Sequence, residues 1–110
     1  MPNWKGNNPQ RSNLTGQPRG QHAMNDTEAV RVMDELVLLW MENHPLLPNN
    51  ARYIASQWRN GFAQIRDYAH CGGRDHRMHI TVTDLYSGAN FHIPVASDVP
   101  GQWRVDVFSY

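Results

Sequence analysis

The densest group of potentially reactive side chains lies between residues 70 and 79, within the stretch HCGGRDHRMH. Histidine, cysteine and aspartate are the side chains that bind zinc. The stretch has neither a Cys-x-x-Cys pair nor two histidines four apart on one helix, which are the usual arrangements. Zinc binding is therefore the third hypothesis, below two others, and no cofactor is expected; the residues would be His70, Cys71, His76 and His79.

Cys71 is the only cysteine, so the fold has no internal disulfide. It follows a predicted helix, and the negative end of a helix dipole disfavours the thiolate that a nucleophile needs. No Gly-x-Ser-x-Gly elbow and no glycine-rich phosphate loop occurs in the chain. The sequence therefore predicts a protein that is not an enzyme.

Nine of the ten basic residues are arginines, and three of them recur every seven residues at Arg52, Arg59 and Arg66. On one helix this spacing makes a single stripe. The stripe either pairs with acids of the preceding helix (Glu28, Asp34, Glu35 and Glu42) or binds a phosphate backbone. The predicted anion-binding or nucleic-acid-binding set adds two following arginines and the basic residues of the amino-terminal segment: Lys5, Arg11, Arg19, Arg74 and Arg77.

Residues 1–24 are rich in proline, glycine and asparagine and contain few apolar side chains. Such a segment cannot bury enough surface to offset the entropy lost on ordering. It carries three basic residues and no acid, so we expect a disordered basic tail. The tail either attaches the protein to an anionic surface or only keeps it in solution.

Two helices are expected after the tail. Asp26 or Thr27 caps the first, apolar residues recur every three or four positions, and His44-Pro45 ends it. Residues 36–41 are apolar on every side, which predicts cover by the domain or by another chain.

The second helix is expected from Asn49 or Asn50 to Gly72-Gly73, with an apolar stripe that stays in phase. Asn60-Gly61 is a frequent turn pair. A chain broken there would resemble a winged helix-turn-helix, with residues 62–69 reading DNA and 86–90 as the wing. One continuous helix is preferred.

Alternation of apolar and polar residues predicts three strands near residues 78–83, 91–95 and 103–107. Short connections favour an antiparallel meander. The predicted fold is α+β, with a two-helix antiparallel hairpin on a three-stranded antiparallel meander, formed by residues 25–110. The predicted core is Val30, Met33, Leu36, Val37, Trp40, Ile54, Trp58, Phe62, Ile65, Ile80, Val82, Phe91, Ile93, Val95, Val105 and Val107.

At 110 residues with balanced charge, the chain is expected to be one soluble domain. No apolar run approaches the ~18 residues of a membrane span, and no secretory signal is evident, so a cytoplasmic location is expected. The leading hypothesis is a small protein-binding module, an inhibitor, adaptor or accessory factor, with homodimerisation also considered. A nucleic-acid-binding regulator is the alternative. The predicted protein interface is Leu38, Leu39, Met41, His79, Thr81 and His92.

Overall fold

The computed structural model describes residues 23–72, 74–99 and 102–109. Almost all of the predicted basic tail, including Lys5, Arg11 and Arg19, lies outside the described residues. Two helices come first, α1 (Asp26–Met41) and α2 (Asn49–Arg59). Four strands follow: β1 (Ala63–His70), β2 (Arg77–Asp84), β3 (Asn90–Val99) and β4 (Gln102–Val105).

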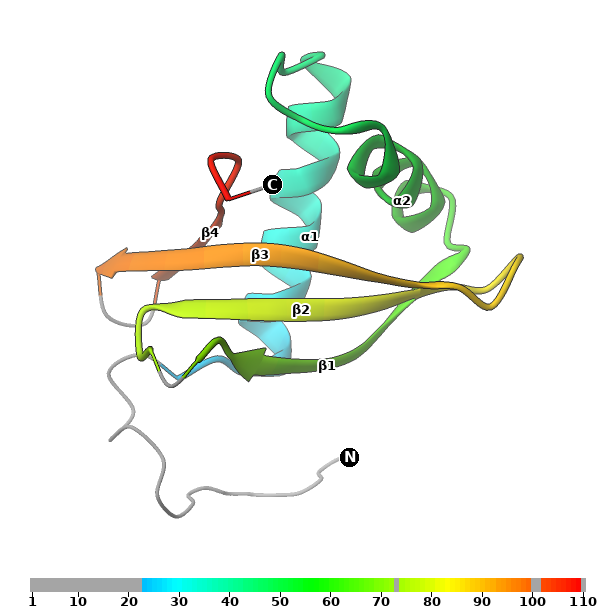
Figure 1. The fold of residues 1–110 in the computed structure, drawn as a ribbon. Helices are drawn as coiled ribbons and strands as arrows, with labels where there is room; N and C mark the ends of the chain where they lie inside the picture. The colour runs from blue at the N-terminus through cyan, green and yellow to red at the C-terminus, as the bar shows by residue number, and fades with distance from the viewer. Residues whose placement is uncertain (1–22, 73, 100–101, 110) are drawn as a thin grey trace.

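The strands form one antiparallel sheet in the order β1-β2-β3-β4, so each pairs with the next along the chain. The α+β class and the meander are confirmed, but the sheet has four strands where three were expected. Figure 1 shows both helices on one side of the sheet. It shows α1 from the side and α2 nearly end-on.

The first helix is confirmed, although its cap differs from the prediction. Asn25, not Asp26 or Thr27, is the N-cap, and its Oδ1 accepts a hydrogen bond from the Glu28 amide at 2.8 Å. After Met41 the chain reaches Asn43 with a φ of 55°, a left-handed conformation that ends the helix before His44-Pro45.

The second helix is shorter than predicted, because the chain turns at Asn60-Gly61. Gly61 has a φ of 82°, which glycine adopts without strain. Residues 63–69, expected as helix, instead form most of β1, and Phe62 precedes the strand. A bulge at Arg66 shifts the register between Ile65 and Asp67. The bulge breaks the strict alternation of the strand, so Arg66 and Asp67 are both exposed, and Ile65 and Tyr68 on either side of them are both partly buried.

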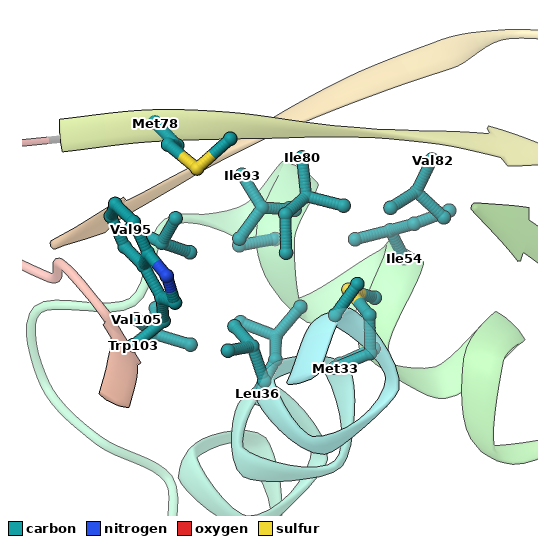
Figure 2. Close-up of a cluster of buried hydrophobic side chains, with 14 of the residues drawn as sticks. Met33, Leu36, Ile54, Met78, Ile80, Val82, Ile93, Val95, Trp103 and Val105 are labelled. Atoms are coloured by element: carbon teal, nitrogen blue, oxygen red, sulfur yellow. The ribbon is translucent and has the colours of Figure 1, made fainter. Parts of the chain in front are cut away.

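The core lies between the helices and the inner face of the sheet. Figure 2 shows Met33 and Leu36 of α1 and Ile54 of α2 pointing toward the side chains of the strands. Eight predicted core residues are buried: Met33, Leu36, Ile54, Ile80, Val82, Ile93, Val95 and Val105. Val37, Trp40, Trp58, Ile65, Phe91 and Val107 are partly buried against them.

Two core predictions are wrong, and several core residues were not predicted. Val30 and Phe62 are 42% and 51% exposed. Val30 lies outside the buried stripe of α1, and Phe62 precedes a strand that was expected to be helix. The unpredicted buried residues are Ala29, Val32, Leu47, Ala51, Ala55, Met78, Ala96 and Trp103.

One of the two alternatives paired the acids of the first helix with the arginine stripe. In the structure Glu28 and Glu35 bind the main chain of β4 instead. Glu28 accepts a hydrogen bond from the Trp103 amide at 2.9 Å, and Glu35 accepts one from the Val105 amide at 3.3 Å. Arg31 binds Glu28 and also donates to the Trp103 carbonyl. In the described sheet β4 is an edge strand, and these side chains bond its main chain as a neighbouring strand otherwise would.

Among the described residues, no helix has the length and apolar character needed to cross a membrane.

Candidate protein-docking site

The most highly organised polar group in the structure surrounds Asp84, the last residue of β2. Its side chain has no solvent-exposed surface, although it lies just beneath a surface turn. The carboxylate accepts hydrogen bonds from the Tyr53 hydroxyl at 2.7 Å and the Gln57 amide at 2.8 Å, both from α2. Asp84 thus ties the end of the sheet to the second helix.

The same carboxylate holds the turn between β2 and β3. It accepts hydrogen bonds from the Ser87 hydroxyl at 2.7 Å and from the amides of Tyr86 and Ser87 at 3.2 and 3.3 Å. The Asp84 carbonyl accepts from the Gly88 amide at 2.8 Å, and Gly88 has a φ of 80°, which glycine suits. Side chains of the turn itself, Asp84 and Ser87, therefore stabilise this conformation of its main chain.

The charge at Asp84 is stabilised by these donors. The Tyr53 hydrogen bond, with those from Gln57, Ser87 and the Tyr86 amide, lowers the pKa of Asp84 far below its ordinary value, although burial acts to raise it. The same hydrogen bond raises the pKa of Tyr53, because the phenol must keep its proton to donate it. Asp84 is therefore ionised and Tyr53 is neutral near neutral pH.

Large apolar side chains stand exposed around this network. Tyr53 is 42% exposed, Phe62 51%, Leu85 53% and Tyr86 86%; together they are called the hairpin-end patch. The Leu85 amide donates to the Phe62 carbonyl at 2.9 Å, so the start of β1 and the turn lie side by side. The rings of Tyr53 and Phe91 are 5.8 Å apart. Figure 1 shows this turn projecting from the end of the sheet nearest α2.

The predicted polar interface residues His79, Thr81 and His92 lie together on the sheet face away from the helices. Thr81 is opposite His92 in the β2–β3 register, and its hydroxyl is 3.2 Å from His92 Nδ1. The rings of His79 and His92 are 6.3 Å apart in an edge-on arrangement. No helix packs on this face in the described structure.

The predicted apolar interface residues lie elsewhere, near the carboxyl end of α1. Leu38 and Met41 are 57% and 56% exposed, whereas Leu39 is partly buried against the core. The apolar segment 36–41 is thus covered by the domain on one side and exposed on the other.

The predicted zinc ligands are only partly brought together. Cys71 Sγ lies 2.8 Å from His79 Nδ1. His70 lies against Trp103, with the ring centres 6.3 Å apart, and His76 lies in the turn before β2. Among the described residues, no three His, Cys, Asp or Glu side chains are placed to hold a metal. Cys71 follows a strand and not a helix; burial raises the pKa of its thiol, and the charge of Arg77 opposes that effect.

The predicted arginine stripe does not exist, because its members lie on different elements. Arg52 and Arg59 are on α2, Arg66 is on β1, Arg74 is in the following turn and Arg77 is on β2. Arg52 bonds the α1–α2 connection through the carbonyls of His44 and Leu47, and Arg77 pairs with Asp106 at 2.5 Å. The reading helix of the winged helix-turn-helix alternative is likewise absent, since residues 62–69 lie in β1 and the residue before it. Nucleic-acid binding stays a prediction.

Sequence reasoning assigned residues 85–90 to a turn and missed the hairpin-end patch. The available signal was the pair Leu85-Tyr86 inside a predicted turn. Large apolar side chains in a surface turn do not contribute to the core, so they indicate a binding surface instead. Comparison with models of known protein families, with curated proteins and with solved structures found no match for the chain.

Proposed function

We propose that the protein is a non-enzymatic protein-binding module that docks through the hairpin-end patch. The observation that carries this proposal is the group of exposed apolar side chains beside a turn fixed by buried Asp84. Aromatic side chains dominate the binding energy of many interfaces, and charges are depleted at interface centres. The carboxylate of Asp84 lies within the patch but is buried, so it exposes no charge at the proposed interface.

Rigidity supports the same proposal. Binding costs free energy when loops and side chains must be ordered, and a surface already fixed avoids part of that cost. The hydrogen bonds to Asp84 fix the main chain at Tyr86 and Ser87 and the phenol of Tyr53 before any partner arrives. This arrangement favours a partner that presents its own apolar side chains to a preformed surface.

The test is quantitative capture of proteins from the native host with two matched pairs of substitutions. Leu85→Asp with Tyr86→Asp alters the hairpin-end patch, while Leu38→Asp with Met41→Asp alters the exposed end of α1. All four side chains are more than half exposed, so both variants are expected to fold. We expect specific partners to be lost only with the first pair, with affinity reduced about thirtyfold or more for a hot-spot residue. Unchanged capture by that pair, or loss only with the α1 pair, contradicts the proposal.

A further inference from the structure

One arginine beside the hairpin-end patch has two guanidinium nitrogens without a partner. Arg66 is exposed on β1, and its Nε donates a hydrogen bond to the Thr83 hydroxyl at 3.0 Å. Within the described residues, its terminal nitrogens Nη1 and Nη2 form no hydrogen bond, and no ion pair includes Arg66. Both nitrogens are therefore available to an acceptor on another molecule.

A buried threonine fixes the position of this guanidinium. Thr83 is 4% exposed, and its hydroxyl donates to Asn90 Oδ1 at 2.6 Å, across the β2–β3 register. Since the hydroxyl proton is given to Asn90, the hydroxyl oxygen accepts from Arg66. A guanidinium that is already held in place loses less conformational freedom when it binds a partner.

The same threonine places Arg66 at the rim of the hairpin-end patch. Thr83 precedes the exposed Leu85 by two residues, and two residues of extended chain span about 7 Å. Phe62 lies beside Leu85, because its carbonyl accepts from the Leu85 amide. An exposed cation therefore stands next to exposed apolar side chains.

The charges around the patch favour an acidic partner. Residues 53–66 and 82–95 contain one acid, Asp84, which is buried and already accepts several hydrogen bonds. Apart from one histidine, the basic side chains of these two segments are Arg59 and Arg66, and both are exposed. The two segments therefore present positive charge and no accessible carboxylate.

We propose that the partner docks through an acidic apolar segment, which places an apolar side chain on the hairpin-end patch and an aspartate or glutamate carboxylate on Arg66. The two available nitrogens of the guanidinium match the two oxygens of a carboxylate. The short distance from Thr83 to Leu85 requires the acid to lie within about two residues of the apolar side chain. This inference rests on the proposed function and adds the chemistry of the partner.

A nucleic acid fits the same surface less well. A phosphate backbone is bound by a row of cations, whereas Arg66 is followed by Asp67, which is exposed and repels a polyanion. Asp67 is opposite Thr81 in the β1–β2 register, farther from the turn than Thr83. A single carboxylate that approaches Arg66 from the turn avoids that repulsion.

The first experiment selects binding peptides from a displayed library of random sequences. The full chain is the target, and peptides that also bind the variant Leu85→Asp with Tyr86→Asp are discarded, so the retained peptides require the hairpin-end patch. We expect them to share a leucine or aromatic residue with an aspartate or glutamate at most about two positions away. If no peptide is retained, the docking surface and this inference are both contradicted; retained peptides without a shared acid overturn this inference alone.

The second experiment measures the affinity of one retained peptide by calorimetry. Arg66→Gln keeps a donor for Thr83 but removes the charge, so it should weaken binding about tenfold or more. Arg74→Gln, at an exposed arginine in the connection at the other end of β2, is the matched control and should leave the affinity unchanged. Replacing the acid of the peptide with its amide should weaken binding to wild type by a similar factor, and binding to Arg66→Gln much less.

The possible results separate this inference from the docking surface itself. An affinity that Arg66→Gln does not change, or that Arg74→Gln lowers equally, overturns the carboxylate contact and leaves the hairpin-end patch as the docking surface. Oligodeoxythymidine that binds wild type more tightly than the peptide, and is lost with Arg66→Gln, overturns the choice of an acidic protein segment. Self-association in sedimentation equilibrium that is lost with Leu85→Asp and Tyr86→Asp identifies a second copy as the occupant and overturns it too.

Discussion

Asp84 shows how one side chain can organise the local structure. It is the shared acceptor of α2, the end of β2 and the β2–β3 turn, so several donors depend on a single carboxylate. The sequence did not distinguish this aspartate from others near turns, because Tyr53 and Gln57 are about thirty residues away along the chain. Its role depends on tertiary contacts.

Replacing Asp84 with asparagine should reduce stability at neutral pH, because the amide cannot accept from every donor as the carboxylate does. Since the folded pKa of Asp84 lies below its ordinary value of 3.8, the charge stabilises the fold above that pH, and this contribution is lost as the pH falls toward the folded pKa. The stability difference between wild type and Asp84→Asn should therefore narrow below about pH 4.

The measurement is chemical denaturation of both proteins at a series of pH values. The pKa values of Glu28, Asp98 and Asp106 are also lowered, but these groups are present in both proteins and cancel in the difference. A stability difference that does not change between pH 7 and pH 3 would contradict the assigned role of the Asp84 charge.

Two aromatic residues give contrasting predictions at the same scale. Trp103 is 1% exposed and packs in the core, so Trp103→Ala should lower the free energy of unfolding by about 3–5 kcal/mol. Phe62 is 51% exposed, so Phe62→Ala should lower it by less than about 1 kcal/mol. Urea unfolding of both variants checks this, and a loss at Phe62 equal to that at Trp103 would show that Phe62 belongs to the core.

At the scale of elements, the decisive feature is the change from helix to strand at Asn60-Gly61. Asn60 keeps right-handed helical angles, with a φ of −84°, and Gly61 reverses the sign of φ. The turn pair was visible in the sequence. The longer helix was preferred because Phe62, Ile65 and Ala69 are spaced in helical phase, but Phe62 and Ala69 are exposed in the structure, so this spacing marks no buried face.

Gly61→Ala should therefore destabilise the protein by about 1–2 kcal/mol through backbone conformation alone. A methyl group at this position would meet no atom within 4 Å, so steric overlap adds nothing. Asn60→Ala is the matched control and should change stability by less than about 0.5 kcal/mol. Thermal unfolding compares the two, and equal stability of Gly61→Ala and wild type would argue against the left-handed turn.

The edge of β4 gives a second prediction about elements. Burial raises the pKa of Glu35, so its ionised form lowers the stability of the folded protein at neutral pH. The same side chain provides the oxygen that accepts a hydrogen bond from the Val105 amide. A raised folded pKa means that Glu35 favours folding at low pH and that this contribution is lost as the pH rises. Glutamine keeps the acceptor without the charge, whereas alanine removes both.

Glu35→Gln should accordingly be as stable as wild type, or more stable, at pH 7. Glu35→Ala should lose about 1–3 kcal/mol, because a buried amide is left without its acceptor. Amide hydrogen exchange at Val105 should be faster in the alanine variant only. If exchange at Val105 is the same in all three proteins, the Glu35 side chain does not protect this edge.

Over the whole molecule, the sequence predicted the class and the order of elements better than their extent. The α+β class, the first helix, the antiparallel meander and half of the core followed from apolar periodicity and turn residues. The hairpin-end patch did not, because it forms where the start of β1 meets the turn after β2, and β1 was expected to be helix. One misassigned segment therefore concealed this surface.

The hairpin-end patch depends on residues 63–70 forming a strand, and nuclear magnetic resonance measures the conformation of this segment most directly. We predict extended backbone chemical shifts over this segment, with cross-strand contacts between Gln64 and Thr83 and between Ala69 and His79. Helical shifts continuing from α2 through Ala69, without those contacts, would contradict both the strand and the hairpin-end patch.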